Sequence, residues 1–242
     1  MSDLIEGRNA VIEALRAGRV VTAVLIAAGT KGAPVDEVRR LAAEVGVPVK
    51  TVPRHVLDER SVRGAHQGVV AEATPFEYTA LADIIASAAE RPRSLVVVLD
   101  HITDEGNLGA VARSAEVAGA DGLVVPKARS AQVGTVAQKT SAGALAYLPG
   151  AREPNIVQVL GRLKEHGYWV VGASEKADTL AWEAPIEGRI ALVVGAEGEG
   201  LARLVEKTCD LLVGLPVAGS IDSLNVAQAA TVLMFEWVRR GT

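Results

Sequence analysis

The residues best suited to chemistry lie in three segments of the C-terminal two-thirds of the chain, and the first is Asn107–Arg113. Asn107 follows a strand that ends at Asp100, so it is suited to cap the next helix, with Gly109 allowing close packing. Arg113 invites another interpretation, because it stands on an Ala-rich helix near the carboxyl end of a strand, where open α/β sheets bind ligands. An arginine is costly to bury there without a polar partner. Asn107 and Arg113 are therefore candidates for positioning a phosphate and an adjacent hydroxyl.

The second segment, Gly195–Gly200, joins a buried strand to a helix. Its sequence, GAEGEG, lacks the glycine spacing of the dinucleotide fingerprint G-x-G-x-x-G. Two carboxylates, Glu197 and Glu199, would also repel a pyrophosphate. An acidic loop suits a cationic, hydroxyl-bearing ligand such as S-adenosylmethionine, which carries a sulfonium, an ammonium and ribose hydroxyls. The alternative is a tight turn whose glutamates complement the dipole of the next helix.

The third segment, Leu215–Asn225, leads from a strand into an apolar helix predicted over residues 224–240. Ser223 has the residue type of a helix N-cap. Asn225 falls in the first turn of this helix, where a polar side chain requires a buried partner. The helix is more apolar than a solvent-facing helix usually is, so we expect it to be core or half of a subunit interface.

Two series of alternating strands and helices would position these segments. Residues 1–73 predict a small α/β domain, residues 74–93 a linker with a weak helix near 81–89, and residues 94–242 a mostly parallel sheet with helices on both faces. In the first series we expect strands at 21–28, 48–52 and 68–73, and helices at 7–17, 34–45 and 56–60. In the second we expect strands at 94–100, 122–126, 168–173, 189–195 and 211–215, and helices at 108–119, 130–143, 155–166, 200–207 and 224–240.

Composition excludes several classes of protein. The sequence has one cysteine, Cys209, and four scattered histidines, so neither a disulfide framework nor a metal site is expected. It has no apolar run of membrane-spanning length and a polar amino terminus, which predicts a cytoplasmic protein. The net charge of −4 means that any contact with RNA must come from local basic patches.

Taken together, the three segments resemble the motifs of the SpoU (TrmH) family of RNA methyltransferases in the SPOUT superfamily. The resemblance spans residues 94–242 and rests on Asn107-Leu-Gly with Arg113, Gly195-Ala-Glu-Gly-x-Gly-Leu, Leu215-Pro with Ser223-Leu-Asn225-Val-Ala, and Lys139-Thr-Ser141-Ala-Gly143. Residues 1–73 resemble the L30e-like RNA-binding domain of 23S rRNA guanosine 2′-O-methyltransferases, through Glu6-Gly-Arg-Asn-Ala-Val-Ile and His66-Gln-Gly-Val-Val-Ala. One departure is Asp104-Glu-Gly106, where many members of the family have a proline after the aspartate.

The resemblance implies a fold, a cofactor and partners. The catalytic domain would be an α/β fold whose C-terminal segment forms a trefoil knot, preceded by the small α/β L30e-like domain. S-adenosylmethionine would bind against this knot, and the enzyme would be a homodimer whose active site is completed across the interface. The implied cofactor-binding residues are Gly195, Glu197, Gly200, Leu215 and Leu224. The candidates for RNA contact in the N-terminal domain are Arg8, Asn9, His66 and Gln67, although Arg8 and Asn9 equally suit the start of the first helix.

The implied reaction is attack of a ribose 2′-oxygen on the sulfonium methyl group. A guanidinium is a very weak base, so we expect Arg113 to orient phosphate and hydroxyl, and to act as the base only if its environment is unusual. The residues expected to shape the catalytic pocket are Asn107, Glu197, Ser223 and Asn225. Cys209 lies beside apolar residues, and this reaction needs no covalent adduct with the enzyme.

Three alternatives compete with methylation of a 23S rRNA guanosine. The first is 2′-O-methylation of another rRNA nucleotide or of tRNA, although the tRNA enzymes resemble the C-terminal part alone. The second is a ribosome-assembly factor that binds rRNA without turnover, which would not need the cofactor loop. The third is a nucleotide-dependent dehydrogenase, which the glycine spacing disfavours.

Overall fold

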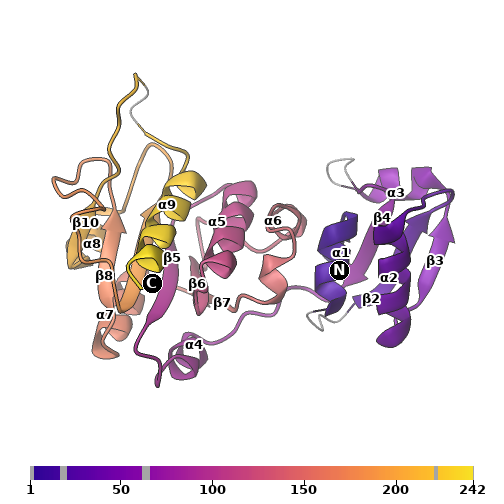
Figure 1. Cartoon of the computed structure of the whole chain (residues 1–242), viewed down its shortest axis with the longest axis horizontal. Coiled ribbons are helices and arrows are strands. Elements are labelled where there is room, and N and C mark those ends of the chain that lie inside the picture. Colours follow the sequence, from indigo (N-terminus) through magenta and orange to yellow (C-terminus); the bar gives the residue numbers. More distant parts are fainter. Residues whose placement is uncertain (1–2, 17–20, 62–65, 221–222, 242) are drawn as a thin grey trace.

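Two separate β-sheets organise the chain in a computed structural model, which describes residues 3–16, 21–61, 66–220 and 223–241 (Figure 1). The smaller, N-terminal sheet has the strand order β1-β4-β2-β3. Its elements are β1 (Asp3–Glu6), α1 (Arg8–Arg16), β2 (Val21–Ala27), α2 (Ala33–Glu44), β3 (Val49–Val52), α3 (Arg54–Arg60) and β4 (Val69–Ala73). Helices α1 and α2 pack their apolar side chains on one face of this sheet, and Leu57 of α3 packs on the other.

The larger sheet has six strands in the order β10-β8-β9-β5-β6-β7, and every neighbouring pair is parallel. The strands are β5 (Ser94–Asp100), β6 (Gly122–Pro126), β7 (Gly150–Glu153), β8 (Trp169–Ala173), β9 (Arg189–Gly195) and β10 (Leu211–Val213). The central strand β5 is buried along its whole length, as expected for a parallel strand covered on both faces. Because the strands are parallel, all their carboxyl ends lie at the same edge of the sheet.

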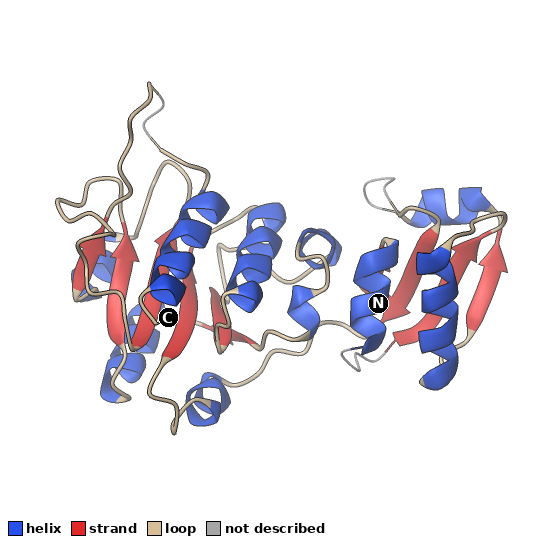
Figure 2. Ribbon diagram, in the orientation of Figure 1, coloured by secondary structure: helices blue, strands red, loops and turns tan. Residues whose placement is uncertain are grey.

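Helices cover both faces of this larger sheet (Figure 2). On one face lie α5 (Glu105–Val117), α9 (Val226–Arg239) and the short 3₁₀ turn Ala144–Ala146. The other face carries α4 (Leu81–Ser87), α7 (Ile156–Glu165) and α8 (Arg203–Thr208). The remaining helix, α6 (Thr135–Thr140), packs against α5 and against β1 of the smaller sheet. The predicted fold class, a mostly parallel α/β sheet preceded by a small α/β domain, is confirmed.

Three expectations about elements need correction. The helix predicted over 130–143 is only α6, since Ala142 and Gly143 have positive φ angles of 50° and 99° that end it. Two four-residue strands, β1 and β7, were not predicted. Residues 74–93 are more than a connection, because Leu81, Ile84 and Ile85 of α4 are buried in the core of the larger sheet.

The described part of the chain contains no helix long and apolar enough to cross a membrane. Within the same residues, no group of three or more His, Cys, Asp or Glu side chains is arranged to hold a metal ion.

Candidate functional site

A pocket of about 470 Å³ opens at the carboxyl edge of the larger sheet, over β8, β9 and β10. Its volume falls in the range of small-molecule sites, which is roughly 300–1,000 Å³. Segments that are far apart in the sequence form its walls: residues 173–176, 194–201, 213–217 and 223–226, together with one side of α9. The pocket-lining residues include all five cofactor-binding candidates, Gly195, Glu197, Gly200, Leu215 and Leu224, and the catalytic candidates Ser223 and Asn225.

The loop after β9 is a tight turn that closes on itself. The Gly200 N–H donates to the Ala196 carbonyl at 2.9 Å, and Gly198 and Gly200 have φ angles of 77° and 71°, which glycine adopts without steric cost. At Gly195, a Cβ atom would lie 2.2 Å from the backbone of Gly200. Glycine is therefore needed at position 195 because the two ends of the loop touch.

Glu197 joins the three sequence segments. Its Oε1 accepts hydrogen bonds from Asn107 Nδ2 at 3.2 Å, from Asn225 Nδ2 at 2.5 Å and from the Val226 N–H at 3.3 Å. Asn225 Nδ2 also donates to Asn107 Oδ1 at 2.9 Å. One carboxylate thus ties the start of α5 to the start of α9 beside the pocket.

The starts of α5 and α9 have caps that differ from those expected. Asn225, rather than Ser223, caps α9, since its Oδ1 accepts from the N–H groups of Ala227 and Gln228. Asp104, rather than Asn107, caps α5 through the Asn107 N–H at 2.7 Å. Asn107 stands in the first turn of α5, which leaves its amide free to reach Glu197. Ser223 is exposed on the pocket wall.

Arg113 lies apart from this network. It is exposed on α5 and does not line the pocket. Six residues along an α-helix span about 9 Å and turn the side chain to another face, so Arg113 and Asn107 point in different directions. It forms no hydrogen bond or ion pair with the residues that the structure describes. Because Arg113 is exposed in the single chain, it needs no buried polar partner there.

Asp100, the last residue of β5, is a further candidate for the site that residue type and spacing did not select. Its carboxylate is completely buried and accepts a hydrogen bond from the Ala202 N–H at 2.7 Å, just beyond the glycine loop. Its other oxygen lies 2.5 Å from His101 Nδ1. His101 has a φ of 59°, a conformation that non-glycine residues rarely adopt. Asp100 thereby fastens the loop after β9 to the end of β5, and its place at a strand end is the signal that could have pointed to it.

Cys209 follows α8, and its half-buried thiol packs near Gly172 of β8, on the face of the sheet that α8 covers. Burial raises its pKa to about 12, so it is protonated at neutral pH and a poor nucleophile. This agrees with the expectation that it takes no part in the chemistry.

The four N-terminal candidates separate into two groups. Arg8, Asn9 and Gln67 are at least partly accessible, and the Arg8 guanidinium donates to the Gln67 carbonyl at 3.1 Å, so they lie together. His66 is completely buried, with Nε2 2.8 Å from Asp58 and Nδ1 accepting from the Gly68 N–H at 2.9 Å. Both of its ring nitrogens are used within the protein, so His66 orders the backbone before β4 and has no free ring nitrogen for RNA.

The chemistry of the pocket suits a ligand that is partly apolar and partly cationic. Leu215, Val217 and Leu224 give it an apolar wall, with Val217 and Leu224 about half exposed. Glu199 and Glu206 add carboxylates to the lining. In S-adenosylmethionine, the purine nucleoside would contact the apolar wall, and the sulfonium and ammonium would lie near the carboxylates.

Comparison with known proteins gives consistent matches over nearly the whole chain. Residues 94–235 match the SpoU rRNA methylase family, and residues 4–79 match the family described as RNA 2′-O ribose methyltransferase substrate binding. A Bacillus subtilis protein named as a TrmH family tRNA/rRNA methyltransferase, YacO, is 39% identical over 98% of this chain and 96% of its own length. An uncharacterised tRNA/rRNA methyltransferase of Mycolicibacterium vanbaalenii is 40% identical over 99% of this chain and 77% of its own.

Solved structures give the same result for the fold. The SpoU methyltransferase AviRb from Streptomyces viridochromogenes, in complex with S-adenosylmethionine, has a TM-score of 0.82 and 28% identity over 99% of this chain and 90% of its own. An S-adenosylmethionine-bound rRNA methyltransferase from Sinorhizobium meliloti has a TM-score of 0.79 and 26% identity over 99% of this chain and 87% of its own.

Proposed function

Since this chain belongs to the SpoU rRNA methylase family, we propose that it uses S-adenosylmethionine to methylate a ribose 2′-oxygen of RNA. The observation that carries the proposal is the pocket beside Glu197, whose carboxylate gathers Asn107 and Asn225. We assign residues 94–242 as the catalytic domain and residues 1–73 as the substrate-binding domain, joined by residues 74–93.

When bound, the cofactor supplies an electrophilic methyl group on a positively charged sulfur. Gly195, Gly200, Leu215 and Leu224 would form its walls through backbone groups and apolar side chains. In the balanced reaction an oxygen–carbon bond would form at the ribose as the sulfur–carbon bond breaks, the electron pair of that bond would stay on the sulfur of the S-adenosylhomocysteine product, and the hydroxyl proton would pass to water.

The chain's own residues position the hydroxyl. Because Glu197 is held by three donors, its second oxygen is available to accept a further hydrogen bond at a defined place. Ser223, which is exposed on the pocket wall, supplies a hydroxyl that can donate or accept. These two groups would hold the ribose hydroxyl against the pocket.

Arg113 would act in the partner subunit's site. Helices α5 and α9 touch where Ser114 Oγ and Thr231 Oγ1 lie 2.6 Å apart. Both helices have exposed residues along this seam: Arg113 and Val117 on α5, and Gln228 and Phe235 on α9. Figure 1 shows α5 and α9 side by side on one face of the sheet. A homodimer that pairs these two helices with their copies would cover Phe235 and Val117. It would also bring Arg113 to a phosphate of the RNA bound in the partner subunit's pocket.

The dimer is tested by mixing two inactive variants, Arg113→Ala and Glu197→Ala. If Arg113 completes the partner's pocket, a mixed dimer has one intact site of two. Random exchange in an equal mixture makes half of the dimers mixed, so activity should return to about a quarter of that of the wild type. Light scattering gives the oligomeric state. An active monomer, or no recovery in a mixture shown to exchange subunits, would contradict the shared site.

The trefoil knot is also part of the proposal. The segment after β10 passes close to residues 179–181: the Gly214 N–H donates to the Thr179 carbonyl, and the Ala181 N–H to the Gly214 carbonyl, both at 2.9 Å. The Ser174 N–H donates to the Val213 carbonyl at 3.0 Å. These bonds support a chain that passes through the 174–188 loop before it reaches α9.

We propose a guanosine of 23S rRNA as the substrate. The support for this substrate is the resemblance of residues 1–73 to the N-terminal domain of 23S rRNA guanosine 2′-O-methyltransferases, and the match of residues 4–79 to a substrate-binding family supports RNA binding by this domain. The test is methyl transfer from labelled cofactor to unmodified large-subunit rRNA and to bulk tRNA, followed by mapping of the modified nucleotide. Incorporation into tRNA alone would overturn the substrate. Cofactor binding without incorporation into any RNA would overturn the enzymatic function and favour a ribosome-assembly factor.

A further inference from the structure

The loop between β6 and α6, residues 127–134, is the basic one among the loops at the carboxyl edge. Its sequence, KARSAQVG, carries Lys127 and Arg129 and no acidic residue. The loops after β5, β8 and β9 each carry at least one carboxylate, such as Asp104, Glu175 or Glu197. Two carboxylates lie close to this loop: Glu105 lies against Gly134, and Glu153, beside Lys127, pairs with Arg162 at 3.8 Å. In a chain of net charge −4, Lys127 and Arg129 are the groups through which this loop offers positive charge to an anion.

Lys127 and Arg129 are available for a partner. Both side chains are exposed, and neither forms a hydrogen bond or ion pair with the residues that the structure describes. The neighbouring Arg152 differs, because its guanidinium lies 5.1 Å from the centre of the Tyr78 ring. Two exposed cations thus lie near a third, Arg152, which contacts an aromatic ring.

The loop is held against the site. The Ile102 carbonyl accepts hydrogen bonds from the Ala131 N–H at 2.7 Å and from Ser130 Oγ at 3.1 Å. Ile102 lies in the loop that leads to Asp104 and Asn107. The basic loop is therefore attached to the segment that carries the catalytic candidate Asn107.

Arg129 also has an unusual backbone. Its φ is 53°, a left-handed conformation in which glycine is the least strained residue. Strained residues of this kind gather at functional sites, and Gln67 and His101 are two others in this chain. A residue other than glycine at such a position is a candidate for a functional role.

The position of the loop indicates that role. Strand order places β6 and β7 between the pocket over β9 and the N-terminal domain (Figure 1). The loop continues directly into α6, which packs against β1 of that domain. An RNA that touches both the N-terminal domain and the pocket has to pass over this flank.

We propose that Lys127 and Arg129 form a phosphate-binding surface for the RNA substrate, between the N-terminal domain and the methyl-transfer pocket. The inference rests on the proposed function for the identity of the polyanion. RNA phosphates suit the surface because binding by lysine and arginine side chains is sequence-independent and needs no shaped cavity.

The test uses the full-length protein with the variants Lys127→Gln, Arg129→Gln and the double variant. We measure RNA binding at several salt concentrations, the KM for RNA, kcat, and cofactor affinity by calorimetry. Each lost phosphate contact should lower the log–log salt slope by roughly 0.7–0.9. We expect the KM for RNA to rise about threefold to tenfold per variant, with kcat and cofactor affinity unchanged.

Three further variants separate a phosphate contact from a structural role. Arg129→Lys keeps the charge and should restore most of the RNA affinity. Arg129→Gly removes the side chain while suiting the backbone, so it should weaken RNA binding without lowering the thermal midpoint. Lys207→Gln is the matched control, because Lys207 is exposed in the last turn of α8, which runs away from the carboxyl edge, and this variant should match the wild type.

The outcomes distinguish this inference from the proposed function. Methylation by the wild type with an unchanged RNA KM and salt slope in the double variant overturns the phosphate surface alone. RNA binding without methyl transfer, still weakened by the double variant, overturns the enzymatic function and keeps the surface. An equal loss in Lys207→Gln would mean a general charge effect and would also overturn the surface.

Discussion

At the scale of single residues, the acceptor role of Glu197 makes a strong prediction. Glu197→Ala removes the acceptor shared by Asn107, Asn225 and the Val226 N–H. Because the network is exposed, the free energy of unfolding should fall by only about 1–2 kcal/mol. Methyl transfer should fall about 100-fold or more, since small misplacements in a positioned site are that costly. Glu187→Gln, an exposed carboxylate before β9, is the control for lost charge, and an active Glu197→Ala enzyme would contradict this role.

Cys209 gives a second prediction at this scale. With its pKa raised to about 12 by burial, the folded thiol should react with iodoacetamide at pH 8 at least about 100-fold more slowly than the denatured chain. The unfolded thiol ionises near pH 9, so the folded state loses stability from this group as pH rises from about 9 towards 12. Cys209→Ser should retain methyl transfer. Fast labelling of the native protein would show that the thiol is not buried in solution.

Single residues also mark the limit of what the sequence predicts. Residue type and spacing selected Glu197, Asn225 and Asn107, which the structure brings within hydrogen-bond distance. The same reasoning chose Ser223 as a helix cap, although Asn225 is the cap. It also gave His66 an RNA contact, and a buried histidine cannot be told from an exposed one without knowing which strands lie beside it.

At the scale of elements, the glycine loop after β9 is the part most sensitive to a single methyl group. Gly195→Ala would place a Cβ atom 2.2 Å from the backbone of Gly200, so the loop has to shift. We expect cofactor affinity to fall at least about tenfold, or 1.4 kcal/mol. The thermal midpoint should fall only slightly, because the loop is exposed and not part of the core.

The matched control is Gly161→Ala in the middle of α7, where an added Cβ meets nothing within 4 Å. This variant should raise the free energy of unfolding by about 0.5–1 kcal/mol, because alanine is the better helix former. Calorimetry measures the cofactor affinity of each variant, and thermal unfolding measures its stability. Normal cofactor binding by Gly195→Ala would show that the loop tolerates displacement.

Elements were predicted best where they are long and buried. The strands at 94–100, 122–126 and 189–195 agree with the structure residue for residue, since continuous apolar runs between turns are typical of a covered parallel sheet. Strands β1 and β7 have four residues each, too few to show a period, and they are strands only because β4 and β6 pair with them. Strand order depends on such pairings between distant segments, so the sequence could not predict which loops meet at the pocket.

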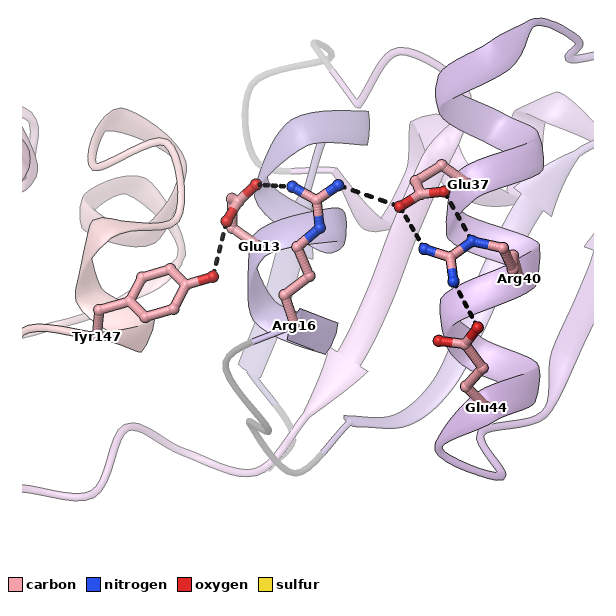
Figure 3. Close-up of polar contacts among 6 residues, drawn as sticks. All are labelled: Glu13, Arg16, Glu37, Arg40, Glu44 and Tyr147. Atoms are coloured by element: carbon pink, nitrogen blue, oxygen red, sulfur yellow. Dashed lines mark hydrogen bonds and ion pairs between the residues drawn. The ribbon is translucent and has the colours of Figure 1, made fainter.

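At the scale of the whole molecule, a series of hydrogen bonds and ion pairs connects the two domains (Figure 3). The Tyr147 hydroxyl of the catalytic domain donates to Glu13 of α1 at 2.8 Å, and Arg16 links Glu13 to Glu37 of α2. Burial, followed by the hydrogen bond to Glu13, raises the pKa of Tyr147, so its hydroxyl keeps its proton at neutral pH. This contact and the packing of α6 against β1 join the N-terminal domain to the larger sheet.

Gly143 lies at the centre of that contact and gives the last prediction. It has a φ of 99°, and an added Cβ would lie 2.3 Å from Glu13 Cβ. Gly143→Ala should therefore push α1 away and loosen the docking of the two domains. We expect a larger radius of gyration in small-angle X-ray scattering and a KM for RNA raised about tenfold, with unchanged cofactor affinity because the pocket lies over distant strands.

Tyr147→Phe is the milder comparison, since it removes one hydroxyl and should cost less than about 1 kcal/mol. If Gly143→Ala scatters like the wild type and keeps its KM for RNA, the position of the N-terminal domain does not depend on this contact. If instead cofactor affinity falls together with the RNA KM, the damage has spread into the catalytic sheet. Only a loss confined to RNA supports a molecule in which one domain holds the substrate at a fixed distance from the other's pocket.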